Sequence, residues 1–263
     1  MATRHSYAPG TPCWVDVSTH DTAATIAFYA ELFGWEARPD QRPEAGDSGM
    51  FALDGALAAG YAPTATADEL PRWTVSMCVA DAEATMARIV AHGGTPLVEP
   101  VDVFDSGRFA LAQDVAGSVV GLWQPATHTG SQVVNDVGAF SWNELGTSDL
   151  SHARHFYGDV FAWEEQEPLT DTAAIFTVDG QVVCGAHTAA GDGEQSGWTV
   201  WFGVAGCEAA AARVVELGGR VLSPPSDMGF GTGAVVADPQ GAVFGITGLT
   251  SADQNLMPSP VLG

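Results

Sequence analysis

Two acidic residues at equivalent positions of an internal repeat are the side chains best placed to do chemistry. Asp16 lies two residues after Trp14, and Glu144 lies two residues after Trp142. Because side chains two apart on a strand share a face, each carboxylate is expected beside an indole. In an apolar surrounding such a group can act as a general acid or base, or bind a ligand hydroxyl. The alternative is a carboxylate satisfied by backbone donors or an arginine.

The elements that must position these residues occur twice. A short alternating strand around Asp16 is followed by Asp21, a typical helix N-cap, and by a helix that ends at Gly34. The same order recurs from Phe140 to Trp163, and a second strand-and-helix unit follows in each half. Each unit is predicted to be strand, helix and three strands. The fold class is therefore α+β, with four βαβββ units forming two curved, open cups.

The turns and composition predict two domains, at residues 10–124 and 138–249. Residues 125–137 are expected to be a linker, and residues 250–263 a flexible tail. The pattern leaves open which units pair to form each cup. The fused halves are expected to act as a monomeric pseudo-dimer or to form a homodimer.

The strand phase predicts which side chains face each cup, because the alternate valines must lie under the helices. Indole groups suit stacking on planar ligands, although these tryptophans could instead simply fill the cups. The predicted ligand-binding or catalytic residues are Trp14, Asp16, Thr74, Ser76 and Trp123 in the first half, and Trp142, Glu144, Thr199 and Trp201 in the second.

Three further features of the sequence could belong to a binding or catalytic site. Arg108, next to Gly107, is expected to pair with Asp16 or with a ligand anion. The glycine-rich stretch at residues 229–233 precedes a strand, so it favours a flexible lid or turn over a phosphate cradle. Cys184 and His187 are three apart on a strand and should point to opposite faces, which predicts a packed thiol and a surface imidazole.

Composition argues against several classes of protein. The formal net charge is −23, and none of the nine basic residues is a lysine. The chain therefore lacks the clustered basic side chains that bind nucleic acid or anionic membranes, and it cannot form a lysine Schiff base. The N-terminus has no apolar segment typical of a signal peptide, and the cysteines are widely spaced. A soluble, cytoplasmic protein without a cofactor is expected.

The chain resembles the vicinal oxygen chelate superfamily, which includes glyoxalase I, bleomycin-resistance proteins and extradiol dioxygenases. The residues that carry the resemblance are 21–35 with Phe28-Tyr29, their repeat at 149–163 with Phe156-Tyr157, and the closing turns at 114–117 and 238–241. The resemblance covers roughly residues 10–249. The tandem arrangement of the two halves is similar to that of the two-domain glyoxalase-like proteins of actinobacteria.

The resemblance also implies where a metal would bind. Metal enzymes of the superfamily use His, Gln or Glu near the start of the first strand of a unit and Glu in its last strand. By strand phase these positions hold Trp14, Thr74 and Gly121 in the first half, and Trp142, Thr199 and Gly245 in the second. None of these side chains supplies an imidazole or a carboxylate, so no metal is expected.

Three functions are therefore consistent with the sequence. The first is metal-independent binding of a planar hydrophobic small molecule, in a drug-resistance or natural-product biosynthetic role. The second is a lyase, isomerase or hydroxylase that uses Asp16 or Glu144 for proton transfer on an aromatic or dicarbonyl substrate. The third is a metal-dependent glyoxalase or dioxygenase.

Overall fold

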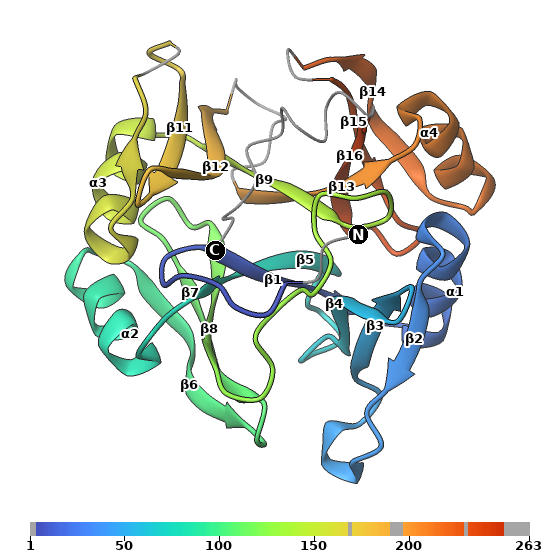
Figure 1. Cartoon of the computed structure of the whole chain (residues 1–263), viewed down its shortest axis with the longest axis horizontal. Coiled ribbons are helices and arrows are strands. Elements are labelled where there is room, and N and C mark those ends of the chain that lie inside the picture. Colours follow the sequence, from blue (N-terminus) through green and yellow to red (C-terminus); the bar gives the residue numbers. More distant parts are fainter. Residues whose placement is uncertain (1–3, 168–169, 190–196, 229–230, 250–263) are drawn as a thin grey trace.

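Two open, eight-stranded sheets and four helices make up the computed structural model (Figure 1). It describes residues 4–167, 170–189, 197–228 and 231–249. The helices are α1 (Thr22–Phe33), α2 (Ala82–Ala91), α3 (Leu150–Phe161) and α4 (Cys207–Glu216), with a 3₁₀ turn at Pro43–Ala45. This architecture confirms the predicted α+β class and the two open cups.

Each sheet takes all its strands from one half of the chain. The first has the order β2-β3-β4-β1-β5-β8-β7-β6, and the second has the order β10-β11-β12-β9-β13-β16-β15-β14. The first sheet consists of β1 (Pro12–Thr19), β2 (Glu36–Pro39), β3 (Gly49–Leu53), β4 (Ala56–Pro63), β5 (Arg72–Cys78), β6 (Thr95–Val103), β7 (Gly107–Gln113) and β8 (Val119–Pro125). The second consists of β9 (Phe140–Thr147), β10 (Glu164–Glu165), β11 (Ala173–Val178), β12 (Gln181–Thr188), β13 (Gly197–Val204), β14 (Arg220–Asp227), β15 (Thr232–Ala237) and β16 (Val243–Gly248).

The pairing of β1 with β5 decides which units share a cup. These strands run antiparallel with Trp14 opposite Ser76 and Asp16 opposite Thr74. Strand β4 joins β1 in parallel, with Gly60 opposite Asp16. The first and second units therefore form one cup, and the pairing of β9 with β13 unites the third and fourth units in the same way.

Aspartates cap the N-termini of three helices. Two of these caps, Asp21 and its repeat Asp149, are predicted from the sequence. The side chains of Asp21, Asp81 and Asp149 each accept a hydrogen bond of 2.9 Å from a backbone N–H in the first turn of their helix. Gly34 ends α1 in the left-handed conformation that glycine adopts without steric cost. These short-range signals explain why the helices begin and end where the sequence predicts.

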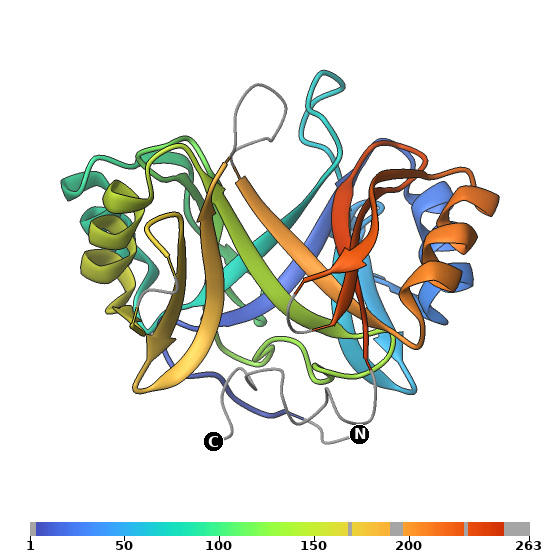
Figure 2. The same cartoon turned by 90° about the horizontal axis from the view of Figure 1, so that it is seen from above.

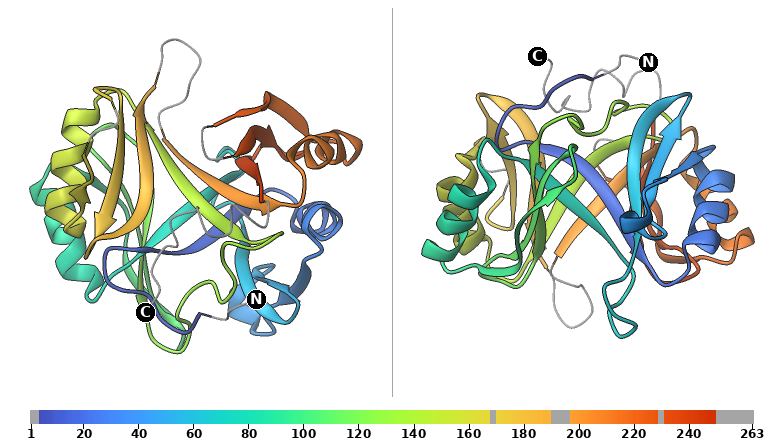
Figure 3. Two further views of the ribbon diagram at one scale, coloured as in Figure 1. Left: turned by 45° about the horizontal axis from the view of Figure 1, so that its top comes forward. Right: turned by 90° about the horizontal axis from the view of Figure 1, so that it is seen from below.

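The convex faces of the two sheets and the four helices enclose one continuous hydrophobic core. Helix α1 lies beside α4 and α2 beside α3, so each helix pair joins the two halves (Figures 2 and 3). The two concave faces open toward opposite sides of the molecule (Figure 1). In the described part of the chain, no helix has the length and apolarity needed to span a bilayer.

Equivalent tryptophans fasten each half to the start of the other. Trp35 Nε1 donates a 2.7 Å hydrogen bond to the carbonyl of Gly138, and Trp163 Nε1 donates one of 2.6 Å to the carbonyl of Gly10. All four groups lie at the junction of the halves, and both indoles are buried. These contacts give Trp35 and Trp163 the structural role that their positions after the helices suggest.

Removing one of these hydrogen bonds is expected to lower stability. Trp163→Phe leaves the Gly10 carbonyl without its donor, which should reduce the free energy of unfolding by about 1–2 kcal/mol in urea denaturation. Trp201→Phe is the matched control, because the buried Trp201 Nε1 has no hydrogen-bond partner among the described residues. Equal losses in the two variants would contradict the assignment, since both remove the same ring volume.

The predicted tail at residues 250–263 lies outside the described residues, as do Gly229 and Phe230 of the glycine-rich turn.

Candidate functional site in the first cup

A cavity of about 510 Å³ occupies the concave face of the first sheet. Its wall draws on both units of the first half and on His128, which follows β8. Among the residues that line its inner part are Trp14, Asp16, Leu57, Gly60, Phe109, Trp123 and His128, and the segments 38–42 and 48–50 lie nearer its rim. The inner lining is mainly apolar and aromatic, with Asp16 and His128 as its ionisable groups, which is typical of a small-molecule site.

Three rings form the floor of this cavity. The imidazole of His128 meets the ring of Trp14 nearly edge-on, with centroids 4.4 Å apart, and lies 5.4 Å from the ring of Trp123. Trp123 Nε1 donates a 2.8 Å hydrogen bond to the backbone carbonyl of His128. The floor is therefore fixed by packing and by a hydrogen bond before any ligand arrives.

His128 keeps its imidazole neutral. Burial lowers the pKa of His128 to about 4, because the imidazolium form would lose its hydration. Its Nε2 atom is buried and has no hydrogen-bond partner among the described residues. A neutral ring with an unpaired nitrogen can serve a ligand as either donor or acceptor, depending on its tautomer.

Asp16 is the one carboxylate beside the aromatic floor. No described residue donates a hydrogen bond to this half-buried carboxylate, and burial raises its pKa to about 7, against a smaller opposing effect of Arg72. Near neutral pH the group therefore exists in both protonation states. It can accept a hydrogen bond from a ligand, donate one, or exchange a proton.

The absence of a side chain at Gly60 leaves space for Trp14 and Asp16 on the neighbouring strand. A Cβ atom at this position would come within 3.1 Å of Trp14 Nε1 and 3.2 Å of the Asp16 Cβ. Gly121 has a similar relation to Ser76, whose Oγ would lie 2.2 Å from an added Cβ. Small residues on the neighbouring strands thus allow the larger side chains of β1 and β5 to fill the cup.

The structure brings together most of the predicted residues of the first half. Trp14, Asp16 and Trp123 line the cavity as the strand phase indicates. Thr74 and Ser76 lie opposite Asp16 and Trp14 in the register and are buried beneath the lining. They can support the floor, whereas the first three can meet a ligand.

The expectation that Arg108 faces Asp16 or a ligand is wrong. Its guanidinium forms ion pairs with Glu83 of α2 and with Asp102 of β6, the second at 2.9 Å. Phe109, the next residue on β7, lies opposite Trp123 and lines the cavity. Because side chains alternate along a strand, Arg108 must point to the helix-covered face.

The second cup satisfies its carboxylate internally. Glu144 Oε2 accepts a 2.8 Å hydrogen bond from Trp142 Nε1, and Oε1 lies 3.0 Å from His187 Nδ1. Glutamate reaches its indole because it is one methylene longer than the aspartate of the first cup. The equivalent carboxylates therefore have different surroundings, and the alternative of a satisfied carboxylate describes Glu144 better than Asp16.

The other predicted residues of the second cup are also placed by the register. Thr199 lies opposite Glu144, and Trp201 lies opposite Trp142. The ring of Trp201 covers Gly245 so closely that an added Cβ would come within 2.1 Å of it. Thr199 is half-buried and Trp201 is buried, so the indole fills the floor of this cup.

The prediction for the Cys184 and His187 pair was correct in one part and wrong in the other. Cys184 is a buried thiol of the core, as expected. His187 is half-buried and pairs with Glu144, so it is not a simple surface imidazole. The alternation along β12 correctly placed Cys184 and His187 on opposite faces. The carboxylate that pairs with His187 belongs to Glu144 on the neighbouring strand β9. His152 and His155 of α3 are exposed, as the helical spacing of the sequence predicts.

Sequence reasoning missed His128, Phe109 and the rim segment around Arg42. His128 lies in the stretch treated as a linker, where no strand pattern assigns a face. Phe109 could have been found from its pairing position opposite Trp123, had the register of β7 and β8 been known. Residues 38–49 are polar and contain two prolines, a pattern that predicts only a turn.

Open sheets of paired βαβββ units around a concave face define the vicinal oxygen chelate class of fold. The model of the glyoxalase-like domain family matches the chain twice, at residues 14–120 and 143–247. The chain therefore belongs to the glyoxalase-like domain family, with one copy in each half.

Relatives and solved structures agree with this assignment. The chain is 34% identical over 256 residues to the putative glyoxylase CFP32 of Mycobacterium tuberculosis, covering 94% of this chain and 97% of the relative. It is 33% identical over 265 residues to the anthracycline biosynthesis protein DauV of Streptomyces sp. strain C5, covering 94% and 96%. The Mn(II)-bound glyoxalase from Novosphingobium aromaticivorans has the same fold, with a TM-score of 0.65 and 17% identity over 91% of this chain and 82% of that one.

The residues of the two cups do not fit the divalent ion that this fold often holds. Beside the floor of the first cup, the described residues supply two groups that could ligate a metal, the Asp16 carboxylate and the His128 imidazole. Among the described residues of the second cup, Glu144 and His187 are the suitable side chains, and they bond to each other. A transition-metal site generally needs three such ligands, and the described residues contain no group of that size.

Proposed function

We propose that the first cup binds a planar, largely apolar small molecule without the aid of a metal ion. One observation carries the proposal: a mainly apolar cavity of about 510 Å³ contains a carboxylate with no hydrogen-bond partner among the described residues. The indole floor offers flat surface to a ring system, and Asp16 offers a hydrogen bond to a polar group at its edge. The second cup, with its carboxylate already satisfied, is proposed to be a structural copy.

The relatives support a role in natural-product chemistry. Two of them are named anthracycline biosynthesis proteins: DauV of Streptomyces sp. strain C5, and DnrV of Streptomyces peucetius. Anthracyclines are fused, planar aromatic molecules with hydroxyl and keto groups at their edges. We infer a ligand of this general shape, in a biosynthetic or resistance role.

A second candidate function is proton transfer by Asp16. A general acid or base works best when its pKa lies near the working pH, and burial raises the pKa of Asp16 to about 7. The group would then act on an aromatic or dicarbonyl substrate held on the indole floor. A metal-dependent glyoxalase or dioxygenase remains a third candidate, which the donor set disfavours.

Calorimetric titration with a hydroxyanthraquinone such as alizarin tests the binding proposal. Trp14→Ala is expected to weaken binding by about tenfold, because stacking on an aromatic ring contributes on the order of 1 kcal/mol. Trp142→Ala removes the equivalent indole from the other cup and should leave the affinity unchanged. Thermal unfolding of both variants checks that the fold is retained.

The same titration separates the candidate functions. Binding that persists with a chelator, without change of the ligand, supports the first function. Turnover that is lost in Asp16→Asn supports the second, and turnover lost on adding the chelator supports the third. Equal affinities of wild type and Trp14→Ala would contradict the placement of the ligand.

A further inference from the structure

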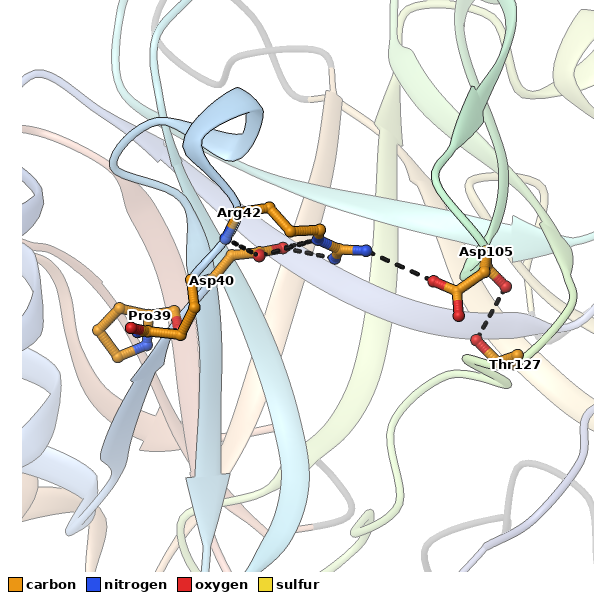
Figure 4. Close-up of polar contacts among 6 residues, drawn as sticks. Pro39, Asp40, Arg42, Asp105 and Thr127 are labelled. Atoms are coloured by element: carbon orange, nitrogen blue, oxygen red, sulfur yellow. Dashed lines mark hydrogen bonds and ion pairs between the residues drawn. The ribbon is translucent and has the colours of Figure 1, made fainter.

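Arg42 spans the mouth of the first cup. It follows β2, which is at one edge of the sheet, whereas β6 lies at the opposite edge. The guanidinium nevertheless reaches the hairpin between β6 and β7, where Nη1 lies 3.4 Å from Asp105 Oδ1 (Figure 4). The curvature of the sheet thus brings its two edges close enough for one side chain to connect them across the cavity opening.

Contacts within each edge hold the two ends of this connection. On the β2 side, Arg42 Nε donates to both carboxylate oxygens of Asp40, at 2.9 and 3.1 Å. On the β6 side, Thr127 Oγ1 donates a 2.8 Å hydrogen bond to the backbone carbonyl of Asp105 (Figure 4). Arg42 is therefore aimed across the opening by its neighbour, and its acceptor belongs to a hairpin fastened to the chain after β8.

Phe104 adds a second contact at the same place. The Arg42 guanidinium carbon lies 3.8 Å from the centroid of the phenyl ring, in a cation–π arrangement. Phe104 has φ 51° and is 46% exposed, although bulky residues rarely adopt the left-handed conformation and phenyl rings usually avoid solvent. A strained backbone that presents an apolar ring to solvent is more typical of a functional segment than of a structural turn.

The sequence of the second half lacks these groups. No arginine occurs between Arg154 and Arg213, so the segment equivalent to Arg42 has no cation. At the positions equivalent to Phe104 and Asp105 the sequence has Met228 and Gly229, and the nearest acidic residue is Asp227. The cross-mouth connection belongs to the half that has the cavity with the unpaired carboxylate.

We propose that Arg42, Phe104 and Asp105 form a strap that retains a planar ligand in the first cup. The strap must open for the ligand to enter or to leave, so weakening it should raise the rate of release. The guanidinium presents a flat, weakly hydrated surface that can stack on a ring system, which favours planar ligands over compact polar ones. This inference depends on the proposed binding function.

Asp105→Asn tests the strap with little disturbance to the fold. The substitution removes the cross-mouth ion pair but leaves Asp40 to hold Arg42. Asp102→Asn is the matched control, because Asp102 lies on the same hairpin strand, makes the same change in net charge and pairs with Arg108. Release of alizarin is followed by stopped-flow displacement at low and high salt.

The dissociation rate constant of Asp105→Asn is expected to rise on the order of threefold at low salt, the range that exposed ion pairs produce. Phe104→Ala should raise it further. Salt screens exposed charges, so wild-type release should accelerate with ionic strength while that of Asp105→Asn stays nearly constant. Asp102→Asn should behave as wild type at both salt concentrations.

The outcomes separate the two proposals. If wild type does not bind alizarin, the proposed function fails and the strap fails with it. If wild type binds but Asp105→Asn and Asp102→Asn release the ligand at the same rate, only the strap is contradicted.

Discussion

Asp238→Ala is expected to lower the free energy of unfolding by about 2–4 kcal/mol, because it leaves buried hydrogen-bond donors without their acceptor. Asp238 Oδ1 accepts hydrogen bonds from the backbone N–H groups of Gln240, Gly241 and Ala242, at 2.8–2.9 Å. Its Oδ2 accepts a 3.2 Å hydrogen bond from the hydroxyl of Tyr29. Alanine leaves all four donors without their acceptor, and an unsatisfied buried donor is costly.

Asp238 lies in the second half but bonds to a residue of the first, so its loss should destabilise the contact between the halves. Tyr29 belongs to α1 of the first half, and its hydroxyl also accepts a 2.8 Å hydrogen bond from Trp73 Nε1. The equivalent contact joins Asp114 of the first half to Tyr157 of the second, at 2.9 Å. These reciprocal contacts fasten each helix to the closing turn of the other half, so losing one should loosen the pairing of the halves.

Urea denaturation measures this effect. Asp238→Asn keeps an acceptor for the backbone donors and should lose less than alanine. Asp68→Ala is the surface control, because Asp68 is exposed on the loop between β4 and β5. A loss in Asp238→Ala as small as that in Asp68→Ala would show that the interlocking hydrogen bonds contribute little.

Asp16→Asn should remove a large part of the pH dependence of stability. Burial raises the pKa of Asp16 to about 7 in the folded protein, well above the ordinary value of about 4 for a solvated aspartate. The folded state therefore holds this proton more tightly than the unfolded state. The stabilisation is complete below about pH 4 and is lost as the pH rises through about 7, by on the order of 3 kcal/mol. Asparagine cannot ionise, so its variant should lack this decline.

The measurement is the free energy of unfolding of wild type and Asp16→Asn at a series of pH values. The difference between the two curves should grow in favour of the variant between about pH 4 and pH 8. Asp68→Asn replaces an exposed carboxylate and should follow the wild-type curve. Parallel curves for wild type and Asp16→Asn would mean that Asp16 is solvated and lacks the proposed proton affinity.

Much of the fold could be predicted from local patterns. Alternation along β1 placed Val15 and Val17 in the core and Trp14 and Asp16 in the cup, because side chains on a strand alternate with a period of two. Asp21 capped its helix because the carboxylate of a preceding residue satisfies a free backbone N–H. The repeat then carried the same interpretation to the second half.

Less of the site could be predicted, because its chemistry depends on contacts between distant segments. Arg108 was expected in the cup, but its partner Glu83 lies on α2, on the other face of the sheet. His128 comes from a stretch with no periodic pattern, and only packing places it between Trp14 and Trp123. Neither result follows from residue type and spacing alone.

Local sequence patterns are enough to predict the four units, the helix ends and the faces of the central strands, because each depends on interactions within a few residues. The pairing of β1 with β5 could be seen only in the folded chain, since either open strand edge could accept several partners. The difference between Asp16 and Glu144 also depends on the folded chain. Glu144 is one methylene longer and pairs with Trp142 and with His187 of a neighbouring strand, whereas half-buried Asp16 has no donor among the described residues, and desolvation raises its pKa.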